Sequence, residues 1–263
     1  MRRVLTDFKK QLKDLVTRGY VRSEVVLLVL TVGYEETFRL WLGSQGAPSK
    51  KDILIVACDE KSFGFYKNEG FTTLSTKTDG TREDLWRLRT EVFAELSQLG
   101  VDFFHTDADA IWRKDPREYC RAQIADLVVS QGTICPKETC RAWGFVLCCG
   151  FFYARATKNT AAIFQKAAEH CDSMLKAHDQ VALNTVLLEA GCNWNQSDET
   201  SERRQFQGEV IRFFNHPIYG ECKTPRTRVC LLPLALFDRM GLNDENCYVE
   251  HILKNKKCEK DQE

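Results

Sequence analysis

The chain has no long apolar run and no excess of either charge. The longest strongly apolar run, Val25 to Leu30, is far too short to cross a bilayer. Lysine and arginine together number 37, as do aspartate and glutamate, so no net charge would attract nucleic acid or an anionic membrane. The first 20 residues are charged and amphipathic, unlike a secretory signal peptide. We expect a soluble protein with no transmembrane segment, no nucleic-acid partner and a cytoplasmic location. The Golgi lumen is the alternative if this is a domain of a longer, membrane-anchored chain.

The cysteines lack the paired CxxC spacing of structural zinc sites, although the chain contains 12 of them. Cys58, Cys148 and Cys149 lie in apolar segments, where a free thiol behaves as a small hydrophobic group. We therefore expect reduced thiols. A disulfide between Cys135 and Cys140, closing a small loop in an oxidising compartment, is the alternative.

The sequence also lacks internal repeats and low-complexity linkers, which favours a single domain over residues 1–263. Short apolar runs alternate with helical patterns through the first half, a pattern typical of a doubly wound, mostly parallel α/β sheet with flanking helices. The expected strands are 24–31, 52–58, 71–75, 101–104, 124–130, 143–153, 211–214 and 229–232. The expected helices are 2–18, 35–44, 60–69, 82–99, 157–170 and 179–189, while 135–140 should form a loop and 198–207 a loop or exposed helix.

Two carboxylates, Asp107 and Asp109, follow the expected strand over 101–104. In extended backbone, residues i and i+2 project to the same side, so both acids can converge on one cation. Carboxylate oxygens suit Mg²⁺ or Mn²⁺ better than a softer metal. Acids at the carboxyl end of a buried strand also lie where open α/β sheets bind ligands. A solvated loop is the alternative interpretation of this DxD pattern.

Two earlier strand ends carry further candidate ligand-binding residues. Thr31, Gly33 and Tyr34 follow the first strand, where Gly33 would let a ligand approach the backbone and Tyr34 could stack on a base. A simple β-to-α turn is the alternative. Asp59 is another acid at the end of a strand. The segment TVGY is not the Gly-rich, basic phosphate loop expected of a nucleotidyltransferase.

Four sequence blocks resemble those of nucleotide-diphospho-sugar transferases. They are DADAIWRKDP, CCGFFYARAT, HDQVALNTVL, and FDRMG followed by YVEHILKNKK. In this order they are similar to the retaining glycosyltransferases of family 77, which have the GT-A fold, and the resemblance covers roughly residues 24–257. It implies a nucleotide-sugar-binding half over 24–130 and an acceptor and catalytic half over 131–257, preceded by an amphipathic helix over 1–20.

In that family the two acids bind a divalent metal, usually Mn²⁺, that holds the diphosphate of the sugar donor. The resemblance implies that Asp107 contacts the metal or the donor ribose, that Asp109 ligates the metal, and that His251 completes the metal shell. Arg89 falls where the family usually has a basic residue, and Lys254 would neutralise phosphate. A metal at this point would stabilise the negative charge that develops on the nucleoside diphosphate.

The block HDQVALN resembles a DQDALN block that lies beside the sugar at the reaction centre. The resemblance implies that Asp179 binds sugar hydroxyls and that Gln180 supports positive charge near the anomeric carbon. Retention needs an enzyme nucleophile or front-face attack guided by the leaving diphosphate, and Gln180 is a poor nucleophile, so we favour front-face attack. The chain departs from the family at Val181, which replaces a carboxylate, and at Cys148 and Cys149, which replace better hydrogen-bonding residues.

Together these features predict a metal-dependent glycosyltransferase, with Mn²⁺ or Mg²⁺ as cofactor. It would move a hexose or pentose from a nucleotide-diphosphate sugar, with UDP as the favoured nucleotide, to a hydroxyl of a glycan or glycoconjugate acceptor, with retention. One alternative is an inert nucleotide-sugar-binding or interaction module, which the departures at Val181 and Cys148 favour. The other is a metal-dependent nucleotidyltransferase.

Overall fold

The computed structural model describes residues 2–76, 81–195, 201–242 and 245–252. Lys254 therefore lies outside the described residues. Within these ranges, no helix combines the length and apolar character needed to cross a membrane.

The core of the fold is a nine-stranded sheet with the order β3-β2-β1-β4-β7-β6-β12-β11-β8. Only β7 and β11 run against the direction of the other seven strands. The strands are β1 Glu24–Leu30, β2 Ile53–Ala57, β3 Thr72–Ser75, β4 Asp102–Thr106, β6 Leu127–Gln131, β7 Leu147–Ala154, β8 Asn193–Trp194, β11 Ile218–Lys223 and β12 Arg226–Leu231. The mostly parallel α/β sheet predicted from the alternation is confirmed.

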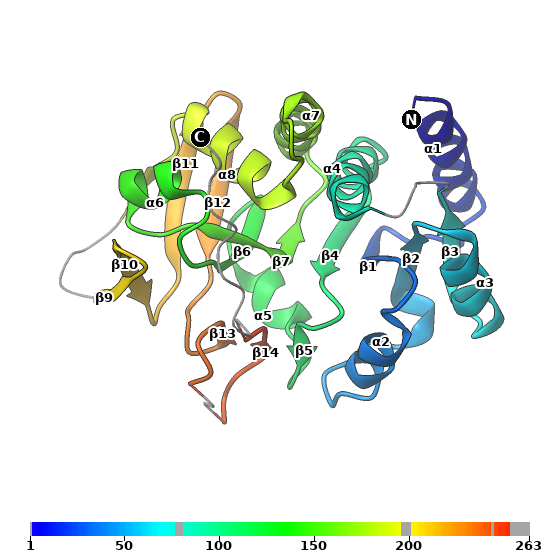
Figure 1. Ribbon diagram of the computed structural model, residues 1–263, viewed down its shortest axis with the longest axis horizontal. Helices are drawn as coiled ribbons and strands as arrows, with labels where there is room; N and C mark the ends of the chain where they lie inside the picture. The colour runs from blue at the N-terminus through cyan, green and yellow to red at the C-terminus, as the bar shows by residue number, and fades with distance from the viewer. Residues whose placement is uncertain (1, 77–80, 196–200, 243–244, 253–263) are drawn as a thin grey trace.

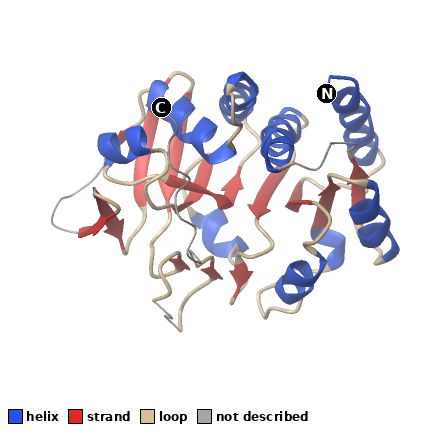
Figure 2. Cartoon of the chain, in the orientation of Figure 1, coloured by secondary structure: helices blue, strands red, loops and turns tan. Residues whose placement is uncertain are grey.

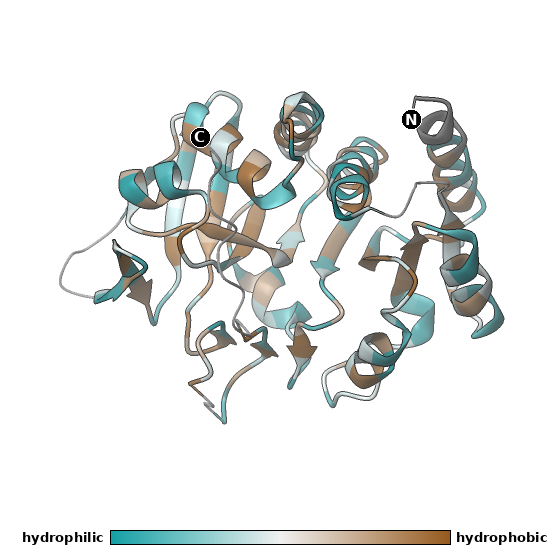
Figure 3. Cartoon of the chain, in the orientation of Figure 1, coloured by the Kyte–Doolittle hydropathy of each residue, from teal (hydrophilic) through white to brown (hydrophobic). Residues whose placement is uncertain are grey.

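Helices cover both faces of this sheet (Figures 1 and 2). One face packs against α1, α4, α7 and α8, and the opposite face against α2, α3 and α5. The helices are α1 Arg2–Thr17, α2 Glu35–Leu42, α3 Glu60–Asn68, α4 Arg82–Gln98, α5 Arg117–Ala122, α6 Lys137–Trp143, α7 Lys158–Ser173 and α8 Asp179–Glu189, with a 3₁₀ turn at Lys50–Asp52. This two-sided cover explains the near-continuous apolar sequence of the central strands, because neither face meets water (Figure 3).

Aromatic side chains fill the core on both sides of β4. Successive residues of a strand point to opposite faces, so Phe103 and Phe104 enter different layers. Phe103 stacks on Phe93 of α4 with 5.6 Å between ring centroids. Phe104 stacks on Tyr153 of β7 at 4.4 Å. The strand that carries the DxD pattern is thus anchored at its base by large buried rings, which fixes where its carboxyl end lies.

A second, three-stranded sheet brings the late part of the chain to the end of β4. It has the order β13-β14-β5, with β5 Ile111–Trp112, β13 Phe237–Asp238 and β14 Val249–Glu250. Strand β14 pairs antiparallel with β5, so that Val249 lies opposite Trp112. Two residues per strand are too few to produce a recognisable apolar pattern, and none of these strands was predicted.

Several segments differ from the sequence-based expectation. Residues 135–140 do not form only a loop, because α6 begins at Lys137, and β7 begins at Leu147 instead of residue 143. Residues 201–206 form a strand, β9 Ser201–Phe206, that pairs with β10 Glu209–Phe214 in a separate hairpin. Gln207 and Gly208 both have positive φ, as a two-residue hairpin turn requires, and this turn holds the polar segment in a strand.

The expectation of reduced thiols is wrong for two cysteines. Cys192 and Cys222 form a disulfide, because Cys192 directly precedes β8 and Cys222 lies in β11, its antiparallel neighbour. The alternative pair, Cys135 and Cys140, does not form a disulfide.

Asn184 of α8 ties the start of β7 to the helix layer. Its amide oxygen accepts a hydrogen bond from the Leu147 N–H, and its amide nitrogen donates to the Leu147 carbonyl, both at 2.9 Å. The Asn184 side chain is fully buried. Asn184 therefore satisfies both backbone polar groups of Leu147, as a neighbouring strand would.

We expect Asn184→Ala to lower the free energy of unfolding by about 2–4 kcal/mol, because both polar groups of Leu147 lose a buried partner. The exposed Asn193→Ala is the control and should change it by less than about 0.5 kcal/mol. Urea denaturation followed by circular dichroism measures both. Equal effects of the two substitutions would contradict this role of Asn184.

Candidate active site

The two acids of the DxD pattern lie in a tight turn at the carboxyl end of β4. The Asp107 N–H donates to the Gly150 carbonyl of β7 at 2.7 Å, and the Ala110 N–H donates to the Asp107 carbonyl at 3.0 Å. The first bond continues the β4–β7 pairing and the second closes the turn. Asp107 and Asp109 are thus presented at the edge of the sheet, directly before β5.

His251 joins these acids because β14 pairs with β5. The residue follows β14 directly, and its Nε2 lies 3.2 Å from Asp109 Oδ1 and 3.8 Å from Asp107 Oδ2. One donor atom from each of the three residues lies within 4.8 Å of the others. We call these residues the Asp-Asp-His cluster. His251 is largely buried, and the two acids are partly exposed, so the cluster is open on the carboxylate side.

The donor set fits a hard or borderline divalent cation. Two carboxylates and one imidazole nitrogen suit Mn²⁺, and a carboxylate-dominated set also suits Mg²⁺. Gly150 leaves the space that this arrangement needs. A Cβ atom at Gly150 would lie 2.1 Å from His251 Cε1 and 2.8 Å from Asp107 Oδ2. The backbone of β7 is therefore part of the wall of the cluster.

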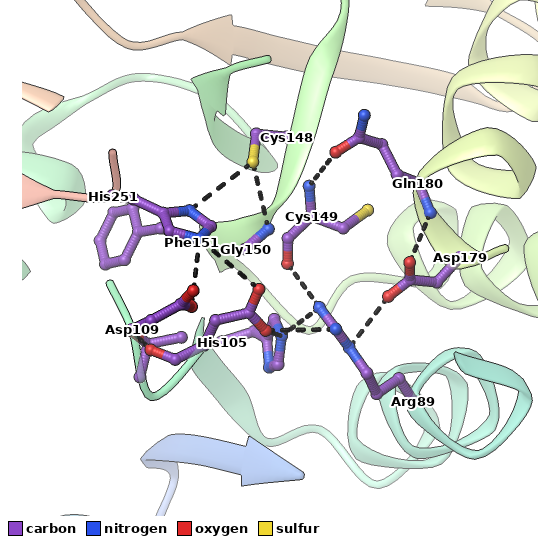
Figure 4. Close-up of polar contacts among 12 residues, drawn as sticks. Arg89, His105, Asp109, Cys148, Cys149, Gly150, Phe151, Asp179, Gln180 and His251 are labelled. Atoms are coloured by element: carbon purple, nitrogen blue, oxygen red, sulfur yellow. Dashed lines mark hydrogen bonds and ion pairs between the residues drawn. The ribbon is translucent and has the colours of Figure 1, made fainter. Parts of the chain in front are cut away.

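Arg89 of α4 connects the cluster to the start of α8 (Figure 4). Its Nη1 lies 3.2 Å from Asp107 Oδ1 and its Nε lies 2.9 Å from Asp179 Oδ2. Its Nη2 donates to the Cys149 carbonyl at 2.8 Å and lies 2.7 Å from His105 Nε2. The guanidinium is buried, and its observed partners are these protein groups. A direct contact of Arg89 with the nucleotide stays a prediction.

The charge of Arg89 sets the protonation of its neighbours. Burial, and then the positive charge of Arg89, lowers the pKa of His105 to about 4. His105 is therefore neutral near pH 7, with Nε2 accepting from Arg89. Burial alone would raise the pKa of Asp107, but the Arg89 guanidinium, together with His105 and His251, outweighs burial and holds that pKa well below its usual range. Asp107 stays ionised, as a metal ligand must.

Cys148 of β7 lies behind the imidazole of His251 (Figure 4). Its Sγ is 3.9 Å from His251 Nδ1 and accepts from the Gly150 N–H at 3.4 Å. Burial raises the pKa of this thiol, but the charge of Arg239 and the contact with His251 outweigh burial and lower the pKa to about 7. Arg239 belongs to the FDRMG block, but its effect on Cys148 could not be predicted from the sequence, because it depends on how β13 and β14 pair.

The turn after β1 is held by Asp59. The Asp59 carboxylate accepts from the Thr31 hydroxyl at 3.0 Å and the Val32 N–H at 2.8 Å, and it caps α3 through the Ser62 N–H at 2.9 Å. Gly33 has φ 93°, a conformation that favours glycine. Tyr34 is 44% exposed. Burial, and then the charges of Asp107 and Asp109, raise the pKa of the Tyr34 hydroxyl. Strands β1 and β4 are parallel neighbours, so this turn and the cluster lie at the same edge of the sheet.

Asp179 and Gln180 begin α8 on the other side of Arg89. Asp179 is buried, and His178 is the N-cap residue of the helix. The Gln180 amide oxygen accepts from the Cys149 N–H at 3.4 Å, and its nitrogen donates to the Cys135 carbonyl at 2.7 Å. Gln180 therefore spans β7 and the loop before α6. Its role at the anomeric carbon stays a prediction.

A separate hollow lies at the far edge of the sheet. It has a volume of about 740 Å³ and is lined by residues of β8, β11 and β12, among them Trp194, Tyr219 and Arg226. None of the predicted site residues lines it, so we do not place the site there.

We expect Gly150→Ala to abolish divalent-metal binding at the Asp-Asp-His cluster, because the added methyl group would displace His251 and Asp107. Gly64→Ala is the matched control, since a Cβ atom at Gly64 on α3 meets no heavy atom within 4 Å. Isothermal titration with Mn²⁺, supported by circular dichroism to confirm folding, compares the two. Wild-type Mn²⁺ affinity in a folded Gly150→Ala protein would show that the metal does not bind here.

Comparison with known proteins agrees with this geometry. The sequence profile of the family described as nucleotide-diphospho-sugar transferase matches residues 50–223. This segment contains Asp107, Asp109, Asp179 and Gln180, whereas His251 lies beyond it. No curated protein matches the chain.

The chain is similar to two crystal structures of the glycosyltransferase GlyE from Streptococcus pneumoniae TIGR4, one of which is the apo form. Each has a TM-score of 0.41 and 14% identity, over 63% of this chain and 43% of that chain. It is also similar to the apo structure of the bifunctional glycosyltransferase WbbM, with a TM-score of 0.44 and 9% identity, over 62% of this chain and 37% of that chain. The chain therefore spans less than half the length of these proteins. Because the family profile covers more than half of the chain, including the strand that bears the DxD pattern, the chain belongs to the nucleotide-diphospho-sugar transferase family.

Proposed function

We propose that this protein is a glycosyltransferase that depends on a divalent metal and moves a sugar from a UDP-sugar to an acceptor hydroxyl with retention of configuration. The observation that carries the proposal is the Asp-Asp-His cluster at the carboxyl end of β4. It offers oxygen and nitrogen donors at the sheet edge where open α/β folds bind ligands. The acceptor is a glycan or glycoconjugate.

Asp109 and His251 are the residues that would ligate Mn²⁺ or Mg²⁺, and Asp107 would bind either the metal or the donor ribose. The bound ion would stabilise the negative charge that develops on the diphosphate leaving group. Arg89 keeps Asp107 ionised and fixes its carboxylate in place. The protein therefore contributes a preset arrangement of charges that needs little reorganisation when the donor binds.

The nucleotide base would lie on the turn after β1. The exposed ring of Tyr34 is available for stacking, and its hydroxyl is close enough to Asp107 and Asp109 for their charges to raise its pKa. Thr31 and Asp59 fix the turn through their hydrogen bond, which supports a positioning role for both. Lys254, outside the described residues, would neutralise phosphate.

The transferred sugar would lie between the cluster and the start of α8. Asp179 would bind sugar hydroxyls, with its carboxylate oriented by Arg89. Gln180 would support positive charge at the anomeric carbon. A carboxylate nucleophile at position 181 is ruled out by Val181, and Gln180 is a poor nucleophile. Front-face attack guided by the leaving diphosphate is therefore the route that we favour.

Family membership supports sugar transfer over the nucleotidyltransferase alternative. Assignment to family 77 in particular is part of this proposal. The inert-module alternative predicts nucleotide-sugar binding without turnover.

The proposal predicts that UDP raises the thermal unfolding midpoint only when Mn²⁺ is present, because a ligand that binds only the native state stabilises it. The gain is about 2.7 kcal/mol at a hundredfold excess over the dissociation constant. Asp109→Asn should remove this shift while leaving the midpoint of the ligand-free protein nearly unchanged, since Asp109 is partly exposed. GDP and ADP, each with and without Mn²⁺, test the choice of base.

Asp115→Asn is a control for the loss of one carboxylate, because Asp115 pairs with Arg117 outside the cluster. A UDP shift that persists in Asp109→Asn would contradict the metal assignment. Shifts with GDP or ADP but not with UDP would contradict the nucleotide. A metal-dependent shift without sugar transfer from any UDP-sugar would support the inert-module alternative.

A further inference from the structure

We propose that Cys148 is a positioning residue that holds the His251 imidazole so that Nε2 faces the metal. This inference rests on the metal site of the proposed function. In the comparison with the resembling family, Cys148 counted only as the loss of a better hydrogen-bonding residue. The inference assigns it a structural role.

The argument begins with the two nitrogens of the His251 ring. Nε2 lies 3.2 Å from Asp109 Oδ1, on the side where the carboxylates converge. Nδ1 points the other way and lies 3.9 Å from Cys148 Sγ, within hydrogen-bonding range for sulfur (Figure 4). If Nδ1 carries the proton and donates it to sulfur, Nε2 keeps its lone pair directed at the metal. Metal-binding histidines generally use their second nitrogen in this way.

The sulfur can fix the ring only if it is fixed itself. Cys148 is 2% exposed, and its Sγ accepts from the Gly150 N–H at 3.4 Å. The bond from Gly150 sets the direction in which the sulfur lies. Because Gly150 has no side chain, the ring can approach this strand closely. Cys148 and Gly150 therefore together form the surface against which the His251 imidazole packs.

The backbone of His251 is held independently of Cys148. Its N–H donates to the Asp238 carbonyl at 2.8 Å, and its carbonyl accepts from Arg239 Nη1 at 2.8 Å. These bonds place the backbone of the residue, so the orientation of its ring depends on the side-chain contacts, with Cys148 at Nδ1 and Asp109 at Nε2. Removing the Cys148 sulfur should therefore release the ring without unfolding the β14 segment.

The test compares Mn²⁺ affinity, by isothermal titration, of the wild type, Cys148→Ala, Cys148→Ser and Cys230→Ala. Cys230 is an equally buried strand cysteine in β12, separated from β7 by β6. We expect Cys148→Ala to weaken Mn²⁺ binding by about 10–100-fold. Cys148→Ser should recover part of this loss, because its hydroxyl oxygen can accept from Nδ1. Cys230→Ala should bind as the wild type does.

A second readout uses protein labelled with ¹⁵N-histidine and saturated with Mg²⁺, because without a metal the Asp109 carboxylate, 3.2 Å from Nε2, favours a proton on that nitrogen. With the metal bound, His251 Nδ1 should carry the proton in the wild type and in Cys148→Ser, with the ¹⁵N shift of a hydrogen-bonded N–H. In Cys148→Ala this shift should move toward that of an N–H without a hydrogen bond. The His251 signal is identified by its absence in His251→Gln. If Cys148→Ala does not fold, Cys148→Val, which fills the space without a good acceptor, takes its place.

Wild-type Mn²⁺ affinity in Cys148→Ala, or a loss no larger than in Cys230→Ala, would overturn this inference and leave the proposed function intact. Failure of the wild-type protein itself to bind Mn²⁺ would overturn both. An unchanged ¹⁵N shift of His251 Nδ1 in Mg²⁺-saturated Cys148→Ala would also overturn the positioning role.

Discussion

The arrangement of the site depends on one buried cation. Arg89 pairs with Asp107 on the side of the metal cluster and with Asp179 on the side of α8, and it is itself almost inaccessible to solvent. Two carboxylates this close would repel each other, and a buried guanidinium without partners would be costly. Each charge is therefore tolerable only because the others are present. The metal-binding and sugar-binding ends of the proposed site are therefore held at a fixed distance by ion pairs in the folded core.

The second constraint is the meeting of two distant parts of the chain in the sheet β13-β14-β5. Strand β5 follows the DxD turn directly, and β14 leads directly into His251. The pairing of β14 with β5 therefore brings His251, the third candidate ligand, next to the two acids. Cys148 and Gly150, on β7, complete the surroundings of that ligand from the main sheet. The cluster thus lies where two sheets meet, and each contributes part of it.

Much of the main sheet and the position of the two acids could be predicted from the sequence. The other parts of the site depend on contacts between residues that are distant in the chain. The apolar run before Asp107 indicated a strand that ends at a pair of acids, and the structure has this arrangement. The acids converge through a turn, however, and not through the extended backbone that the i, i+2 argument assumed. His251 was placed only through the resemblance, because β14 is too short to leave a pattern. The contact of Arg89 with Asp179 joins residues 90 positions apart, and no local rule reveals it. The disulfide of Cys192 and Cys222 likewise follows from the pairing of β8 with β11.

The central claim is that the Asp-Asp-His cluster holds a metal that binds the donor diphosphate. Electron–nuclear double resonance on the Mn²⁺ and UDP complex of ¹⁵N-histidine-labelled protein tests it most directly. The account predicts hyperfine coupling to one histidine nitrogen, absent in His251→Gln, together with coupling to phosphorus of UDP. Phosphorus coupling without any histidine nitrogen would contradict the role of His251. Absence of both couplings in the presence of bound UDP would contradict the claim that this cluster is the donor site.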